Sequence, residues 1–541
     1  MSAHRPPPPT LRRRRAGLAL LPLVALACAS LPAPRPGPAP PPLVAVPPGP
    51  PTHLERLAAE LGQGQPPGHS GFGLLEDGES ALQARLQLID LADRTLDLQT
   101  YIWELDRTGR LVLAHVLAAA DRGVAVRILL DDTALQTHEA EWGALDLHPH
   151  VEVRAFNPFL WGRGPSIGQA LEFLLDFERL NRRMHNKALI ADEAFAVVGG
   201  RNFADAYFAR AESANFRDLD LVAAGPAAGD ASRAFAIFWE SRWASPLPPL
   251  RFRPARPTDL DRLRERLGTA ALHADGRPPA ATSPPGETAR ELARTAHELL
   301  WAHGRVLVDD PRKIGSGPRE GNPASELLEL LRHARGEILA EVAYLVPPTG
   351  GIEVLDELSR RGVRLRILTN SLATNDVVAA HAGYANSRPA LVDAGVELYE
   401  LRPDADRGTR HTMVTWPGSH ASLHSKTLVL DGETIFVGSL NLDGRSIFYN
   451  TEIGILVESP ELARRVIAFL DRGCLPESAW RVARRESVDP ALRGTPAGKR
   501  LVWIERRSDG SRKLRHHEPR AGLWRRIQAF LYSHLPIERH L

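Results

Sequence analysis

Two stretches of the chain share one pattern of apolar and polar positions. Each is a helical pattern that ends in Arg-Gly and is followed by a short apolar run rich in β-branched residues and leucine, at 122–129 and at 361–368. Apolar runs of this length are typical of strands in a sheet that is covered on both faces. Helix followed by strand, twice over, predicts an α/β sandwich built from two related halves.

The first 27 residues follow a different pattern. Four arginines, Arg12–Arg15, precede the apolar run Ala16–Ala27. This order is typical of a secretory signal peptide, and the run is too short for a helix that spans a membrane. The end of the run, Val24 to Cys28, resembles a bacterial lipobox in which Cys28 is lipidated; cleavage after Ala27 without a lipid is the alternative. We therefore expect export to the bacterial cell envelope and attachment to a membrane through Cys28.

Proline-rich stretches mark the boundaries between segments. Residues 31–51 and 276–286 hold too much proline and glycine for regular structure and indicate a tether and an interdomain linker. The expected segments are a signal peptide at 1–27, the lipobox Cys28 with a tether at 28–51, a first domain at 52–255, a linker at 256–288, a second domain at 289–490 and a basic C-terminal tail at 491–541.

The two halves carry the same short string, of the form HxKxxxxD. Its members are His185, Lys187 and Asp192 in the first copy and His424, Lys426 and Asp431 in the second. In both copies the histidine lies 62 residues after the glycine of the repeated pattern. The chain has only five lysines beside 62 arginines. A lysine at the same offset in both copies therefore indicates chemistry that arginine cannot perform.

Alternation along the strands gives an expected arrangement for this string. Asp431-Gly432 is a strong hairpin signal and predicts a two-residue turn at Gly432-Glu433. The residues that would then face each other are His424 and Asn441, Lys426 and Ser439, and in the first copy His185 and Asn202, Lys187 and Gly200. Asp192 and Asp431 fall at the turn with the opposite orientation, so we expect them to support the turn and not to touch substrate.

Two His–Lys–Asn groups suit a reaction at a phosphodiester. The anion has to be neutralised, the phosphorus attacked and the leaving oxygen protonated. Ammonium and amide groups can hold the non-bridging oxygens, while one imidazole attacks and the other acts as general acid. Because neither group alone supplies all of this, the duplication is explained. No metal-ligand cluster or phosphate loop is visible in the sequence, so we expect no metal and no cofactor.

The doubled string with its glycine-led continuation, Gly199 to Asn202 and Gly438 to Asn441, resembles the phospholipase D superfamily. Further matches, similar to the C-type cardiolipin synthases, lie at 99–103, 122–132, 180–185, 216–220, 370–376 and 535–538. The resemblance implies two phospholipase D-type halves, each a mixed sheet flanked by helices, related by a pseudo-two-fold axis with the active site between them. It also implies phosphatidyl transfer through a phosphohistidine, from a donor phospholipid to phosphatidylglycerol.

The resemblance implies residue roles as well, by position. These are nucleophile for His185, general acid for His424, phosphate binding for Lys187, Lys426, Asn202 and Asn441, and orientation of an active-site histidine for Asp218 and Glu452. Ser439 has Gly200 as its counterpart, so the two half-sites are not equivalent.

Charge and composition separate the alternatives in part. The net charge is +2, and about −3 once residues 1–27 are removed, which disfavours a superfamily nuclease and nucleic-acid partners. Two cysteines exclude a disulfide framework. A phospholipase D that releases phosphatidic acid and an inactive envelope scaffold stay open as alternatives. The expected partners are phospholipid substrates and a membrane surface.

The C-terminal tail contains an amphipathic segment. From Arg493 onward there are 12 Lys/Arg against 4 Asp/Glu, and apolar residues from Leu523 to Leu535 fall at helical spacing. We favour packing of this helix on the second domain over docking on anionic lipid. Tyr101, Trp103 and Tyr344 are interpreted as core aromatics at strand ends.

Overall fold

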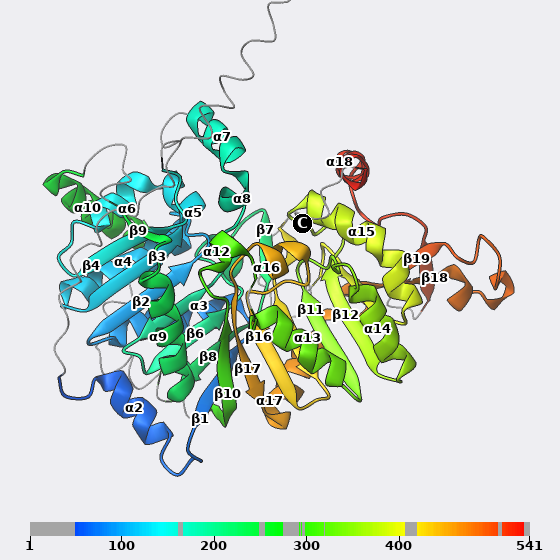
Figure 1. Cartoon of the computed structure of the whole chain (residues 1–541), viewed down its shortest axis with the longest axis horizontal. Coiled ribbons are helices and arrows are strands. Elements are labelled where there is room, and N and C mark those ends of the chain that lie inside the picture. Colours follow the sequence, from blue (N-terminus) through cyan, green and yellow to red (C-terminus); the bar gives the residue numbers. More distant parts are fainter. Residues whose placement is uncertain are drawn as a thin grey trace, which may run out of the picture.

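The computed structural model of the chain (Figure 1) describes residues 49–160, 166–247, 255–273, 292, 294, 298–318, 320–405, 419–506 and 511–534. The predicted signal peptide, Cys28 and the terminal 535–538 match lie outside these residues. Within the described ranges, no helix combines the length and the apolar character needed to cross a membrane.

Most of the described strands of both halves join into one 18-stranded sheet, and β7 and β14 form a separate two-stranded sheet. In the first half the strands follow the order β9 (Ala244–Pro246), β4 (Val151–Phe156), β3 (Ala125–Asp131), β2 (Thr95–Thr100), β5 (Ala188–Ala191), β6 (Phe195–Gly199), β8 (Asp220–Ala224) and β1 (His69–Leu75). Strands β2, β3 and β4 are parallel to one another, and the other pairs are antiparallel.

The second half repeats this order strand for strand. Its strands are β18 (Ala479–Arg484), β13 (Glu397–Leu401), β12 (Arg364–Asn370), β11 (Glu337–Val342), β15 (Lys426–Leu430), β16 (Thr434–Gly438), β17 (Ile453–Glu458) and β10 (Leu300–Val308). Strand β1 pairs with β10 in antiparallel fashion, which joins the halves edge to edge. The prediction of two related halves, each a mixed sheet, is confirmed.

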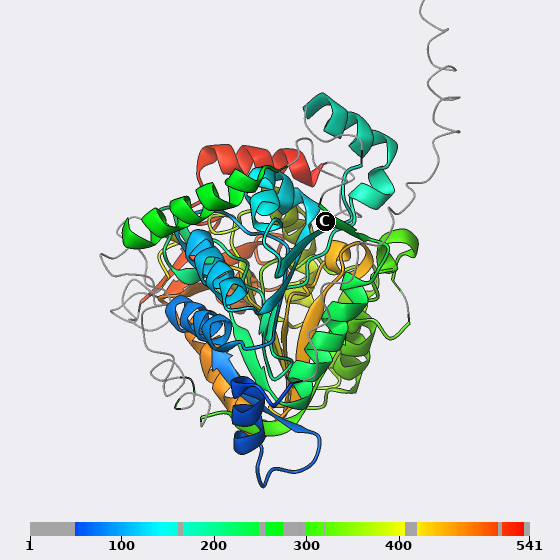
Figure 2. The same cartoon turned by 90° about the vertical axis from the view of Figure 1, so that its left-hand side faces the viewer.

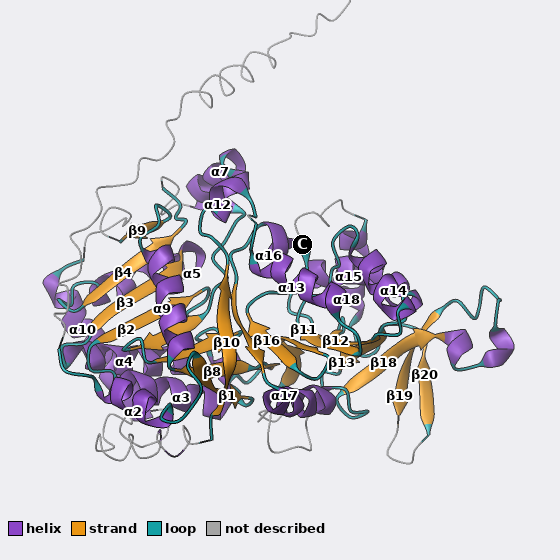
Figure 3. Ribbon diagram, turned by 60° about the horizontal axis from the view of Figure 1, so that its bottom comes forward, coloured by secondary structure: helices purple, strands orange, loops and turns teal. Residues whose placement is uncertain are grey.

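Helices cover the sheet on both sides (Figure 3). In the first half α2 (His53–Leu61), α3 (Gly78–Leu91) and α4 (Arg107–Asp121) bury their leucines against β2 and β3. In the second half α13 (Pro323–His333) and α14 (Gly351–Arg360) cover β11 and β12 in the same way. These helices form the outer layers of the sandwich.

A third core lies between the halves. It is built by α9 (Pro226–Trp239), α17 (Pro460–Gly473) and the facing strands, and its buried side chains include Ile190, Phe235, Val429, Ile455 and Phe469. Both helices begin with proline in the first turn, where a missing N–H costs no hydrogen bond. Because the two halves share this core, the loops at the strand ends of one half are held in a fixed place relative to the other.

Two segments extend this duplicated core. Helix α10 (Pro257–His273) lies in the expected linker, yet Leu263 and Leu267 are buried in the core of the first half. In the tail, β19 (Leu501–Arg506) and β20 (Arg512–Arg515) continue the sheet beyond β18. Helix α18 (Leu523–Ser533) then packs on α15 (Val378–Asp393). Figure 2 shows α18 at the same end of the molecule as α7 (Ser166–Leu175).

Candidate active site

A short sheet made by one strand from each half positions the second histidine. Strand β7 (Ala214–Arg217) of the first half runs parallel to β14 (His420–Leu423) of the second, with Arg217 beside Leu423. The next residues along the two strands are Asp218 and His424. The backbone N–H of His424 donates to the carbonyl of Arg217 at 2.8 Å, which continues the pairing by one step.

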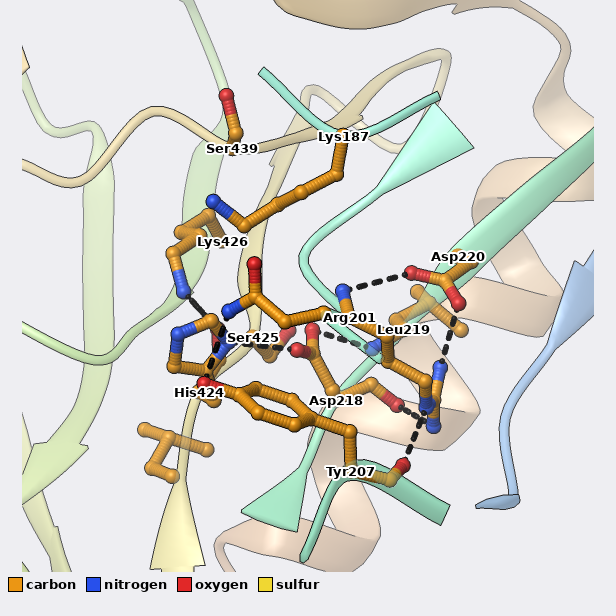
Figure 4. Close-up of polar contacts among 12 residues, drawn as sticks. Lys187, Arg201, Tyr207, Asp218, Leu219, Asp220, His424, Ser425, Lys426 and Ser439 are labelled. Atoms are coloured by element: carbon orange, nitrogen blue, oxygen red, sulfur yellow. Dashed lines mark hydrogen bonds and ion pairs between the residues drawn. The ribbon is translucent and has the colours of Figure 1, made fainter. Parts of the chain in front are cut away.

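The ring of His424 is held by groups from the first half. Its Nδ1 lies 2.8 Å from Oδ2 of Asp218 (Figure 4). The rings of Tyr207 and Phe216 pack against the imidazole, with centroid distances of 5.0 and 5.2 Å. His424 and Asp218 are both buried. The dyad therefore combines an imidazole of one half with a carboxylate of the other.

The first histidine is held in the reciprocal way. Met184 forms a parallel bridge with Thr451, and the N–H of His185 donates to the Thr451 carbonyl at 2.9 Å. Nδ1 of His185 then lies 2.9 Å from Oε2 of Glu452, which belongs to the second half. Each half therefore supplies the carboxylate that binds the histidine of the other half. Because Nδ1 of each ring contacts a carboxylate, Nε2 is the ring nitrogen that can react with a substrate. This arrangement brings the two dyads to one seam between the halves.

The two lysines lie beside their own histidines. Nζ of Lys187 donates to the His185 carbonyl at 2.6 Å, and Nζ of Lys426 donates to the His424 carbonyl and lies 3.0 Å from Nδ1 of that ring. Their side chains extend toward the same space in Figure 4, although they come from different halves. Both residues are at most 3% exposed. Two ammonium groups at one buried position form a site for an anion.

Burial dominates the electrostatics of the seam. It lowers the pKa of His185 and His424 well below the ordinary value, and the two lysines act in the same direction. Burial also lowers the pKa of Lys187 and Lys426. Burial raises the pKa of Glu452 to about 7, against the opposing effect of Lys187. A cluster of groups with shifted pKa values in one place is typical of a catalytic centre.

The predicted hairpin register is wrong by one residue. Strand β15 pairs Leu430 with Thr434, so three residues, 431–433, connect the strands instead of two. The first copy pairs Ala191 with Phe195 across 192–194. Two successive residues with positive φ, 53° and 66° in the second copy, open the longer connection. Because side-chain direction alternates along a strand, a shift of one residue also removes the predicted facing pairs.

The supporting residues consequently lie elsewhere. The Asn202 amide donates to the Tyr207 hydroxyl at 2.9 Å, so it acts near His424 and not opposite His185. The N–H of Asn441 lies 3.3 Å from Oγ of Ser446. Ser439 donates from its hydroxyl to Glu452, and its carbonyl lies 3.2 Å from Nδ1 of His185.

The predicted inequivalence of Ser439 and Gly200 has a steric counterpart. A Cβ at position 200 would lie 2.4 Å from Oδ1 of Asp218, so only glycine admits this carboxylate. The serine in the second half instead contacts the longer glutamate, Glu452.

The two motif aspartates support the hairpins, as predicted. Asp192 accepts from the backbone N–H groups of 93–95, and Asp431 accepts from those of 335–337. Each carboxylate thereby ties the hairpin to the start of the neighbouring central strand, β2 or β11. Neither contacts an imidazole among the described residues.

Replacing Asp431 by alanine is expected to reduce the free energy of unfolding by about 1–3 kcal/mol, because three N–H donors lose their acceptor. Burial alone would raise the pKa of Asp431, but these donors hold it below the ordinary value. The contribution is therefore present above the unfolded-state carboxyl pKa and is lost as pH falls through the lower folded-state pKa. Urea unfolding against pH measures this. A large loss of turnover per folded molecule in Asp431→Ala would contradict the scaffold role.

Several residues of the seam have no signal in the sequence. Tyr207, which packs on His424, lies outside the repeated string. Tyr101 is not a core aromatic as predicted, since it packs against the His185 ring at 5.2 Å and lies under Nζ of Lys187. Trp103, by contrast, is fully buried and donates to the Gly109 carbonyl. The sequence pattern around a tyrosine at a strand end is the same whether the ring lies in the core or packs on an active-site histidine.

Two buried ion pairs lie next to the carboxylates of the dyads, Asp218 and Glu452. Arg217 pairs with Glu341 of the other half at 3.0 Å, directly before Asp218. Lys313 pairs with Asp309 at 2.9 Å, and the same carboxylate oxygen accepts from the N–H of Glu452. The scarcity of lysine marks Lys313 as unusual in the sequence, but the sequence does not indicate its partner. Among the described residues, no group of three or more His, Cys, Asp or Glu side chains is arranged to hold a metal ion.

Comparisons with known proteins agree with this geometry. Residues 86–231 and 327–473 match the family described as "Cardiolipin synthase, PLD-like domain". Cardiolipin synthase C of Escherichia coli is 38% identical over 480 residues, which cover 88% of this chain and 97% of that protein. Cardiolipin synthase A of Yersinia pseudotuberculosis is 24% identical over 392 residues, covering 71% of this chain and 65% of that protein.

A solved structure shares the fold. Phosphatidylserine synthase of Haemophilus influenzae superposes with a TM-score of 0.52 at 13% identity, covering 78% of this chain and 90% of that chain. The two family matches fall one on each half: the first contains His185, Lys187 and Asp218, and the second contains His424, Lys426 and Glu452. The chain therefore belongs to the cardiolipin synthase, PLD-like domain family and is an enzyme of the phospholipase D type.

Proposed function

We propose that the protein is a phosphatidyltransferase that makes cardiolipin from phosphatidylglycerol and a second phospholipid through a phosphohistidine. The observation that carries the proposal is the pair of crossed dyads, His185–Glu452 and His424–Asp218, at one seam with two lysines. Similarity to cardiolipin synthase C over nearly its whole length supports the choice of substrates.

In the first step Nε2 of His185 attacks the phosphorus of the donor lipid. Glu452 accepts a hydrogen bond from Nδ1–H of His185, which orients the ring and stabilises the positive charge that develops on it while the proton stays on Nδ1. The P–N bond forms, the P–O bond to the headgroup breaks, and Nε2 of His424 gives its proton to the leaving alkoxide. Lys187 and Lys426 neutralise the non-bridging oxygens.

In the second step the roles of His424 reverse. It accepts the proton of the acceptor hydroxyl, the new P–O bond forms and the P–N bond breaks, so His185 is restored. Burial and the lysines favour the neutral ring of His424, which suits a base. A bound phosphodiester anion opposes the effect of the lysines and raises the pKa of that ring toward the acid form needed in the first step.

The products decide between transfer and hydrolysis. Purified protein supplied with phosphatidylglycerol is expected to release glycerol and form cardiolipin. Formation of phosphatidic acid without cardiolipin would instead identify a phospholipase D. If the protein releases no headgroup from any phospholipid, the remaining alternative is an inactive envelope scaffold.

We also propose that the protein works at the surface of an envelope membrane, with Cys28 as a lipid anchor. Most of the large exposed apolar side chains lie at one end of the molecule, on α18, on α7 and on α16 (Gly444–Phe448), which follows Asn441 (Figures 1 and 2). Trp524 and Phe530 on α18 are 66% and 64% exposed, although α18 also packs on α15. The contact of α18 with α15 agrees with the favoured expectation that this helix packs on the second domain, while its exposed aromatic residues support the alternative, docking on lipid.

Replacing Trp524 or Phe530 by glutamate is expected to weaken binding to vesicles of phosphatidylglycerol and phosphatidylethanolamine by about tenfold or more, because an aromatic side chain loses its apolar transfer free energy. Co-sedimentation in a Cys28→Ser background measures this without an anchor. Ile237→Glu is the matched control, since this residue is 55% exposed on α9. Equal binding by all variants would contradict the assignment.

A further inference from the structure

A tyrosine and an aspartate form a hydroxyl–carboxylate pair close to the second dyad. The Tyr344 hydroxyl donates to Oδ1 of Asp376 at 2.8 Å. Tyr344 follows β11 and is half-buried, while Asp376 lies in the loop after β12 and is exposed. A carboxylate has about four acceptor positions, so one hydrogen bond from tyrosine does not saturate it. The mechanism above leaves this pair without a role.

Hydrogen bonds from one asparagine place the pair beside His424. The Asn370 amide donates to the carbonyls of Ala343 and Leu423, at 3.1 and 2.7 Å. These two residues directly precede Tyr344 and His424. The Ser422 hydroxyl also donates to the Thr374 carbonyl at 2.7 Å, which ties the Asp376 loop to β14. The pair and the imidazole therefore belong to one rigid cluster.

The tail holds the same loop from its other side. Arg525 of α18 donates to the carbonyls of Ala373 and Asn375. The loop that carries Asp376 is thus fixed between β14, which leads to His424, and the helix with the exposed aromatic residues.

Among the described residues of the first half, no tyrosine–aspartate hydrogen bond corresponds to this pair. The bridges Trp103–Phe203 and Leu345–Leu442 occupy matching places in the two halves, so Tyr344 corresponds to Ile102. An isoleucine side chain has no hydroxyl to offer. In a molecule whose halves otherwise match strand for strand, this difference distinguishes the His424 side from the His185 side. The transfer reaction needs a difference between the His185 side and the His424 side, because the acceptor alcohol binds on only one of them.

The electrostatics fit a neutral hydroxyl beside a charged carboxylate. Burial raises the pKa of Tyr344 well above its ordinary value, and Asp376 adds to this. The tyrosine therefore keeps its proton and can both donate to Asp376 and accept from a ligand. The charge of Asp376 also favours the protonated form of Lys426.

We propose that Tyr344 and Asp376 form the acceptor site, which binds the neighbouring hydroxyls of a glyceryl headgroup and aims one of them at the phosphohistidine. This inference rests on the proposed transfer reaction. The carboxylate accepts from one hydroxyl while the second hydroxyl loses its proton to His424. Its oxygen forms the bond to phosphorus as the bond from phosphorus to His185 breaks. Two hydroxyls bound together discriminate against water and against simple alcohols.

A competition between two soluble alcohols tests the site. The full chain is given phosphatidylglycerol together with equal concentrations of deuterated glycerol and 1-propanol, and mass spectrometry compares deuterated phosphatidylglycerol with phosphatidylpropanol. We expect the wild type to prefer glycerol about tenfold or more, as for sites that hydrogen-bond a substrate hydroxyl. Tyr344→Phe and Asp376→Asn are expected to bring the ratio at least about fivefold closer to parity. The ratio does not depend on how much enzyme is folded, because both alcohols compete for one intermediate.

Asp356→Asn is the matched control, since it removes an exposed carboxylate from α14 of the same half and is expected to keep the wild-type ratio. An unchanged preference in Tyr344→Phe and Asp376→Asn, or no preference in the wild type, would overturn the acceptor site. Cardiolipin is measured in the same mixture: if the wild type forms none, the proposed function fails as well, whereas cardiolipin without a preference between the alcohols overturns only the acceptor site.

Discussion

His185→Ala and His424→Ala are each expected to reduce cardiolipin formation by about 10⁴-fold or more, because each removes a group that the bond changes at phosphorus require. The two variants should fail at different steps. A phosphodiester with a p-nitrophenol leaving group needs no general acid for its departure. On that substrate His424→Ala is expected to give a burst of p-nitrophenol and to accumulate phosphohistidine, whereas His185→Ala gives neither.

The reverse pattern would assign the nucleophile to His424, and full activity in either variant would end the proposed mechanism. Folding is checked by the thermal midpoint, since both rings are buried. The phosphoramidate is acid-labile, so the trapped species should be read by mass spectrometry at alkaline pH. A burst without a modified histidine would point to direct attack by water.

The second large effect concerns the crossed carboxylates. Glu452→Gln and Asp218→Asn are each expected to lower turnover by roughly 10⁴-fold, by comparison with the loss when the carboxylate behind a catalytic imidazole is replaced by an amide. Each change should act on the histidine of the opposite half. Because the pKa of Glu452 is about 7, activity is also expected to fall as pH drops through that value, and the glutamine variant should lose this dependence.

A pair of double variants tests the crossing itself. On the p-nitrophenyl substrate, His424→Ala retains its burst. Adding Asp218→Asn should leave the burst rate unchanged, since its target ring is already gone, whereas adding Glu452→Gln should slow the burst strongly. If Asp218→Asn slows the burst and Glu452→Gln does not, the carboxylates serve the histidines of their own halves and the structural assignment is wrong.

The repeated features of the chain could be predicted because they are local. The doubled string, the scarcity of lysine and the equal spacing to His185 and His424 depend only on order along the chain. The aspartates at the hairpin turns are also local, and the backbone hydrogen bonds of Asp192 and Asp431 agree with the supporting role predicted for them. The same holds for the two halves, since the repeated succession of helix and strand predicts two related halves, although it does not predict the order of the strands in the sheet.

The resemblance implied that Asp218 and Glu452 each orient an active-site histidine, but the sequence could not show which histidine, because each carboxylate meets the histidine of the other half. Asp218 meets His424 only through the pairing of β7 with β14, which joins segments more than 200 residues apart. The predicted positions of Asn202 and Asn441 opposite the histidines were wrong for a different reason. A turn longer by one residue, opened by positive φ at Asp431 and Gly432, changes every facing pair, and the motif alone does not fix the length of the turn.

The exchange of carboxylates between the halves also limits how this gene could evolve. After duplication, two copies of a domain are ordinarily free to diverge, but here any shift of β7 is felt by His424, and any shift of Thr451 by His185. A mutation that moves the carboxylate in one half therefore impairs the histidine of the other half, so selection acts on both halves together. A chain cut within 274–290 should accordingly produce two inert fragments that regain turnover only when they are mixed and reassociate.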